Sequence, residues 1–248
     1  MEKQSKKFKI GIVFCGLLCL AVIGLCLCQA LWIYLPQKQE QKQFEQLRQL
    51  VLQTQEENDD GTSPYAFLKE KNKDFAGWLT IPDTIIDYPV MKSSERNPEK
   101  YLYRDFDTND SYSGTPFVGL DCTDQSDRFV IYGHHMHLGT LFGKLDDYRD
   151  ETFAKAHSVI YYETLTERRE YRVFAALHTK IGDEAYYPYY EKMGDGMEIQ
   201  AEFVNQIVKD ACVVLDKTPP TDKQIVLLST SSYYTGNDRF FVAAYREK

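Results

Sequence analysis

The sequence has few cysteines outside its N-terminal region. Four of the six lie in one apolar segment near the start, and only Cys122 and Cys212 lie beyond it. Two cysteines are too few for a disulfide scaffold, and no cysteine or histidine cluster has the spacing of a zinc site. The apolar spacing of residues 203–212 predicts that Cys212 lies on a helix and faces the core. A Cys122–Cys212 disulfide stays a second possibility.

Positive charge is scarce beyond the first nine residues. Lys3, Lys6, Lys7 and Lys9 against Glu2 give that segment a charge of +3, so a chain with net charge −8 carries −11 in its remainder. An acidic domain is a poor electrostatic match for a phosphate backbone, which excludes nucleic-acid binding. The acidic residues also lack the spacing of a Ca²⁺ loop, so we expect no metal and no cofactor.

The N-terminal segment 10–35 is almost continuously apolar, with Gln29 as the main exception. About 20 residues of helix cross the hydrocarbon core of a bilayer, so this segment is long enough to span it. The lysines precede it, and no basic residue follows before Lys38. By the positive-inside rule, residues 1–9 form a cytoplasmic tail and the rest of the chain lies outside the cell membrane.

An apolar N-terminal segment has two other interpretations. A cleaved signal peptide has a shorter apolar region, and no A-x-A-like cleavage site follows this one. A lipoprotein anchor at Cys28 would be preceded by a small residue, whereas Leu27 is bulky. The sequence therefore favours a single-pass transmembrane helix that stays attached to the protein.

A polar segment, residues 36–64, follows the apolar one and is rich in Gln and Glu. Phe44, Leu47, Leu50 and Val51 recur at the spacing of one helix face. This pattern predicts a helical stalk or linker, and it is equally consistent with a coiled-coil seam or with a helix lying on the following domain. The Gly and Pro near its end mark a break, so we place the catalytic domain at residues 65–248.

The remaining sequence, with abundant Tyr, is typical of a mainly β domain. Short apolar runs with β-branched or aromatic residues predict strands, and helical patterns occur at residues 66–72, 150–156 and 197–215. The strands are expected at 77–81, 85–90, 115–120, 128–132, 158–163, 171–178, 224–229 and 239–245. This order predicts a closed barrel or a sandwich with one long helix inserted between late strands.

Three segments carry side chains that are able to take part in catalysis. In 129–136, a strand ends at a glycine that is followed by His134; in 225–233, a buried strand runs into a row of hydroxyl residues; in 237–242, a strand begins with Arg239. Each segment alone fits an ordinary role, namely a surface turn, hydroxyls that cap backbone groups, or a solvated arginine. Their order along one chain is the informative feature.

Together the three segments resemble the sortase family, which has a strand followed by Gly-His, a strand ending Leu-Ser-Thr-Cys, and a strand that begins with arginine. The Tyr-Gly-His and Thr-x-x-Tyr forms, the segment 141–148 and the helix near 197–215 are most similar to class B. The matching residues are Tyr132, Gly133, His134, Leu228, Ser229, Thr230, Tyr233 and Arg239, with Ser231 at the cysteine position. The resemblance covers about residues 65 to 248.

The resemblance implies a closed eight-stranded β-barrel preceded by helices, and a transpeptidase. In such an enzyme a cysteine thiolate attacks a Thr–Gly bond in a C-terminal sorting signal, and an amine of peptidoglycan or of a pilin resolves the acyl-enzyme. By position, His134 is the acid/base, Ser231 replaces the nucleophile and Arg239 is the electrostatic stabiliser. His135 stands where class B usually has asparagine, and we assign it no catalytic role.

The same resemblance implies a groove for the sorting signal. Leu102, Ser229, Thr230 and Tyr233 are its candidate substrate-binding residues. The tyrosine-rich cluster at 186–190 is a further candidate, and its alternative role is to pack aromatic rings over the barrel.

Ser231 departs from the family pattern at the nucleophile. A neighbouring imidazolium can bring a cysteine pKa into the physiological range, whereas a serine hydroxyl needs a general base held by a third group. We therefore predict that the chain as written is inactive or severely impaired, as an engineered trap or as a natural variant. The alternative is a non-catalytic membrane-anchored receptor for sorting-signal-like peptides. A serine hydrolase is excluded because no Gly-x-Ser-x-Gly elbow surrounds Ser231.

Overall fold

The computed structural model describes residues 2–57, 63–136, 138–180, 193–232 and 238–248. The chain divides into two compact units, Met1–Gln41 and Lys42–Lys248. The first unit is the N-terminal part of helix α1 (Glu2–Glu57). Among the described residues, one helical stretch, Cys15–Glu56 of α1, is long and apolar enough by length and composition to cross a membrane. The expected transmembrane segment therefore forms a helix of sufficient length.

The last part of α1 belongs to the second unit and packs on the barrel. Phe44, Leu47 and Val51 are buried, whereas Leu50 is 47% exposed. The Phe44 ring meets the Tyr88 ring edge-on at 5.1 Å between centroids. Of the three roles that the amphipathic pattern allowed, the structure has the helix lying on the domain.

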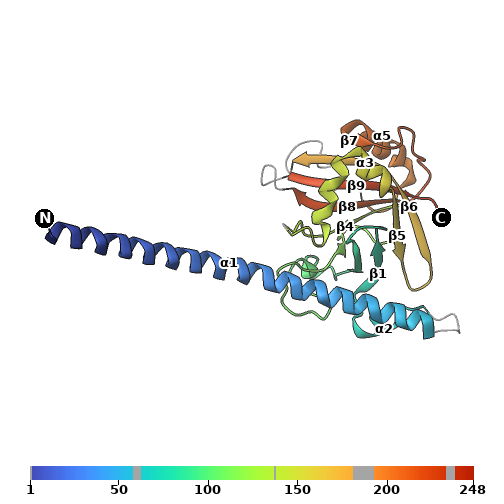
Figure 1. Ribbon diagram of the computed structural model, residues 1–248. Coiled ribbons are helices and arrows are strands. Elements are labelled where there is room, and N and C mark those ends of the chain that lie inside the picture. The colour runs from blue at the N-terminus through green and yellow to red at the C-terminus, as the bar shows by residue number, and fades with distance from the viewer. Residues whose placement is uncertain (1, 58–62, 137, 181–192, 233–237) are drawn as a thin grey trace. The chain divides into compact units, whose positions relative to one another are not determined.

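Eight strands form a closed barrel, as predicted (Figure 1). They are β1 (Phe75–Thr80), β2 (Asp87–Met91), β3 (Phe117–Val118), β4 (Arg128–Tyr132), β5 (Val159–Glu163), β6 (Arg168–Lys180), β8 (Ile225–Ser232) and β9 (Asp238–Arg246). The order around the barrel is β5-β1-β2-β3-β4-β8-β9-β6, and β6 pairs again with β5 to close it. A ninth strand, β7 (Ala211–Val214), adds to the free side of β6.

Among the described residues, the helices that follow α1 are short. They are α2 (Ala66–Lys71), α3 (Glu151–Ala156) and α5 (Gln200–Asp210), with 3₁₀ segments η1 (Lys100–Leu102), η2 (Phe142–Arg149) and η3 (Met197–Ile199). The Asp150 carboxylate caps α3 by accepting the backbone N–H groups of Thr152 and Phe153. This is the preferred chemistry of a helix N-terminus.

One prediction in this region was wrong. The helix expected at 197–215 ends at Asp210, and Cys212 lies on β7, where it is exposed instead of in the core. The apolar residues after 210 alternate as on a strand, and Val213 faces inward. Pairing with β6 satisfies the backbone of this segment, so it overrides the helical pattern. Cys122 and Cys212 are both free thiols.

Aromatic side chains from several strands fill the barrel. Trp78, Phe129, Tyr162 and Tyr171 are at most 1% exposed. The Phe129 ring lies 5.8 Å from the Tyr162 ring and 6.2 Å from the Tyr171 ring, between centroids. The abundance of aromatic residues in the sequence thus reflects a packed interior.

Candidate active site

The pairing of three strands brings the predicted catalytic residues to one edge of the barrel. Strands β4 and β8 run parallel with Tyr132 opposite Ser229. His134, just after the end of β4, and Ser231, near the end of β8, each lie two residues beyond that pair, so they lie at the same level along the two strands. Strand β9 runs antiparallel to β8 with Arg239 directly opposite Ser231, and directly paired residues point to the same face.

Gly133 connects β4 to His134 and allows a close contact with the Phe142 ring. A Cβ atom on Gly133 would lie 2.6 Å from the Phe142 ring, which is closer than side chains tolerate. The backbone N–H of Phe142 donates to the carbonyl of His134 at 3.1 Å. Glycine is thus required here because the Phe142 ring, at the start of η2, packs against the backbone.

The His134 ring is held on its other side by the segment around η1. Its Nε2–H donates to the carbonyl of Leu102 at 2.9 Å, since a carbonyl oxygen only accepts. The Tyr103 ring lies against it, with 5.6 Å between centroids. A proton fixed at Nε2 leaves Nδ1 as the basic nitrogen of the neutral ring. Leu102 therefore orients the histidine through its backbone.

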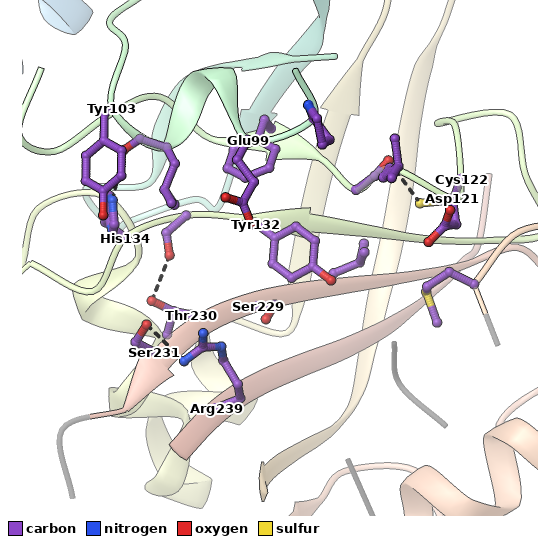
Figure 2. Close-up of a pocket in the computed structure, with 18 residues that line it drawn as sticks. Glu99, Tyr103, Asp121, Cys122, Tyr132, His134, Ser229, Thr230, Ser231 and Arg239 are labelled. Atoms are coloured by element: carbon purple, nitrogen blue, oxygen red, sulfur yellow. Dashed lines mark hydrogen bonds between the residues drawn. The ribbon is translucent and has the colours of Figure 1, made fainter. Parts of the chain in front are cut away.

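Ser231 and Arg239 are in direct contact. The Nη1 of Arg239 donates to the Ser231 hydroxyl at 3.2 Å and to the carbonyl of Asp238 at 3.3 Å. Figure 2 shows both side chains at one end of a pocket, with His134 at the same end. A guanidinium in this place can stabilise negative charge that develops on or beside the side chain at position 231.

The pocket has a volume of about 640 Å³. His134, Ser231 and Arg239 line it together with the predicted substrate-binding residues Leu102, Ser229 and Thr230. Tyr233 and the cluster at 186–190 lie outside the described residues.

Two hydroxyls on β8 differ in their bonding. Thr230 Oγ1 donates to the carbonyl of Gly133 at 2.9 Å and so ties β8 to the turn before the histidine. Ser229 is 1% exposed, and its hydroxyl has no hydrogen-bond partner among the described residues. An unpaired buried hydroxyl costs free energy, so a group of a bound ligand that reached it would be stabilised.

The opposite wall of the pocket was not predicted from the sequence. It is formed by the loop 119–122 after β3. Glu99, Tyr103 and Met193 also line the pocket, and Tyr103 lies beside His134. Figure 2 shows Cys122 on this side, away from Ser231. Burial raises the pKa of the Cys122 thiol, which makes it a poor substitute nucleophile. No local motif marks these residues, because only the barrel closure brings them to the pocket.

His135 is engaged away from the catalytic group. Its Nε2–H donates to the Asp146 carboxylate in η2 at 2.9 Å. Its ring nitrogen therefore helps to hold the turn that carries His134. Within the described part of the chain, no cluster of three or more histidine, cysteine or acidic residues is arranged to bind a metal ion.

Comparisons with known proteins agree with this geometry. The family described as Sortase domain matches residues 79–247. Sortase B of Staphylococcus aureus is 26% identical over 212 residues, covering 79% of this chain and 86% of its own. Sortase B of Listeria monocytogenes is 35% identical over 114 residues, covering 45% and 46%.

A solved structure shares the fold. The Staphylococcus aureus sortase B–substrate complex superposes with a TM-score of 0.75 at 24% identity, covering 86% of this chain and 99% of that chain.

Proposed function

This chain belongs to the sortase family, as a class B sortase, and from that premise we propose that its pocket binds a C-terminal sorting signal of secreted proteins. The signal would be cleaved at a Thr–Gly-like bond by an enzyme with a thiol at position 231. The arrangement of His134, Ser231 and Arg239 around one cavity carries this proposal.

The chemistry divides among these three side chains. The atom at position 231 attacks the threonine carbonyl, and the electron pair of the C=O bond moves to oxygen beside the Arg239 guanidinium. His134 takes up the proton of the attacking thiol at Nδ1 and gives it to the departing amine when the C–N bond breaks. An amine of the cell wall or of a pilin then attacks the acyl-enzyme, its N–H proton passes to His134, and the C–S bond breaks to release residue 231, which recovers that proton.

Ser231 prevents this sequence from running at a normal rate. The hydroxyl accepts a hydrogen bond from Arg239, which draws electron density away from the oxygen. A serine nucleophile also needs a base oriented by a third group, whereas His134 Nε2 is bonded to a backbone carbonyl instead of a carboxylate. We propose that the chain as written binds its substrate without normal turnover, as an engineered trap or as a natural variant.

The direct test is the Ser231→Cys variant, incubated with a fluorogenic library of sorting-signal peptides and an amine acceptor. We expect the variant to cleave at least one peptide and to form the amide with the acceptor. The chain with Ser231 should show at most about one-thousandth of that rate, the order of loss seen when an acyl-transfer triad is incomplete. Thr230→Cys, one residue away on the same strand, is the matched control and should not cleave.

The second candidate is a non-catalytic receptor, which the unpaired Ser229 hydroxyl in a ready-made pocket favours. This function predicts peptide affinity in both forms and no cleavage after Ser231→Cys. If the Ser231 chain itself cleaves well, the proposed loss of activity is wrong.

The proposed site of action follows from the N-terminal helix. An apolar helix preceded by lysines would anchor the chain in the cell membrane with its N-terminus in the cytoplasm. The domain would then face secreted proteins and the amines of the wall or of a pilus.

A further inference from the structure

The wall of the pocket opposite Ser231 depends on one lysine. Lys92 follows strand β2, and its backbone N–H donates to the carbonyl of Asp74 at 2.7 Å, which fixes its main chain beside β1. Its ammonium group points to the loop after β3. There it donates to the carbonyls of Gly119, Leu120 at 3.1 Å and Cys122 at 2.8 Å.

These contacts use the full donor capacity of the side chain. An ammonium has three N–H donors, and Lys92 meets three carbonyls of one short loop. Burial lowers the pKa of Lys92, so its ammonium group is partly removed from water. A charged donor to backbone carbonyls forms stronger hydrogen bonds than a neutral one.

The segment between β3 and β4 begins with the loop 119–122, which is its first half. Beyond the two residues of β3, this half has a bond from the N–H of Gly119 to the carbonyl of Val130 at 2.9 Å, a contact from the Cys122 thiol to the carbonyl of Gly119 at 3.7 Å, and the buried Cys122 side chain. Lys92 adds the charged donors to this half. The second half has separate anchors, because Gln224 and Arg169 both donate to the carbonyl of Asp124. Removing the Lys92 ammonium would therefore loosen the first half and leave the second in place.

The first half is the part that lines the pocket. Gly119, Leu120, Asp121 and Cys122 all contribute to the cavity wall. Lys92 itself does not line the cavity. We infer that Lys92 is a positioning residue for substrate binding, because it fixes the loop 119–122 as the wall of the pocket that faces the sorting signal. This inference rests on the proposed function for the identity of the ligand.

Two measurements on Lys92→Met test the inference. The first uses the full chain in detergent and follows alkylation of Cys122 by mass spectrometry, relative to the exposed Cys212 in the same molecule. A loosened loop should raise the ratio of Cys122 alkylation to Cys212 alkylation about tenfold. The loss of one set of charged hydrogen bonds raises the population of the locally open loop by about this factor. The control Lys155→Met removes an exposed lysine of α3 and should leave the ratio unchanged.

The second measurement adds Ser231→Cys and uses the best peptide from the library. We expect KM to rise about fivefold to tenfold with kcat unchanged, because ground-state and transition-state binding are weakened together. Lys92→Arg, which keeps the charge and several donors, should restore most of the affinity. Should Lys92→Met fail to fold, Lys92→Gln is judged by the same two criteria.

Several results would overturn the inference. An unchanged Cys122 ratio would show that Lys92 does not hold the loop, and an unchanged KM with a loosened loop would show that the loop does not shape the binding site. A fall in kcat at constant KM would place the effect on the chemical step instead. If the library contains no cleaved peptide, the proposed function fails, and the labelling ratio alone decides whether Lys92 holds the loop.

Discussion

At the scale of the residue, the pocket is defined by the contact between a guanidinium and position 231. Arg239 reaches the hydroxyl from the neighbouring strand, so the donor is held in place before any substrate arrives. Electrostatic stabilisation is most effective when the donors are already oriented in this way. We expect a thiol at position 231 to change the nucleophile and to keep this arrangement.

A substitution of Arg239 measures that contribution. In the Ser231→Cys enzyme, Arg239→Lys keeps the charge and loses the planar fork of donors, so kcat/KM should fall about 10²-fold to 10³-fold. Arg172→Lys, on β6 and paired with Glu247, is the matched control and should leave kcat/KM unchanged. Steady-state kinetics with the fluorogenic peptide decides the result, and a decrease of less than about threefold would contradict the assigned role.

At the scale of the element, the last turns of α1 behave as part of the domain. The helix presents Phe44, Leu47 and Val51 to the barrel and directs Leu50 to solvent. Arg48 adds an ion pair to Asp87 of β2 with 3.0 Å between Nε and Oδ2. Because both side chains are partly exposed, the apolar contacts should contribute most of the stability.

Two alanine substitutions on this helix separate packing from helix propensity. Phe44→Ala should lower the free energy of unfolding by about 3 kcal/mol, since it leaves a cavity against Tyr88. Leu50→Ala, six residues further along and exposed, should change it by less than about 0.5 kcal/mol. Urea unfolding of the full chain in detergent gives both values. Equal effects would mean that the helix is not docked on the barrel in solution.

At the scale of the whole molecule, the apolar part of α1 is the basis of the proposed orientation. By the positive-inside rule the lysines before the helix should keep the N-terminus in the cytoplasm, so we expect protease added to intact cells to remove the domain. Replacing Lys3, Lys6, Lys7 and Lys9 by glutamine should lower the fraction of the domain that external protease cleaves. Immunoblotting of cells treated with protease before and after lysis measures this fraction. A domain that is protected until lysis would contradict the proposed orientation.

The sequence alone determined the class of fold and the identity of the central side chains. Alternating and continuous apolar runs are local properties, so most strands were placed within a few residues. The ordered segments with His134, Ser231 and Arg239 were likewise readable, because each lies at a strand end. The helix expected across Cys212 was wrong where pairing with β6 competed with a helical pattern.

Only the tertiary structure decided which residues share the pocket. Leu102 orients His134 across 32 positions of sequence, and Lys92 contacts a loop about 30 residues away. Both contacts are made to backbone carbonyls, which every residue type has, so the sequence does not reveal them. Such contacts depend on the closure of the barrel and not on local preference. The residue at position 231 could therefore be recognised from the sequence, whereas the wall that faces it could be found only in the folded molecule.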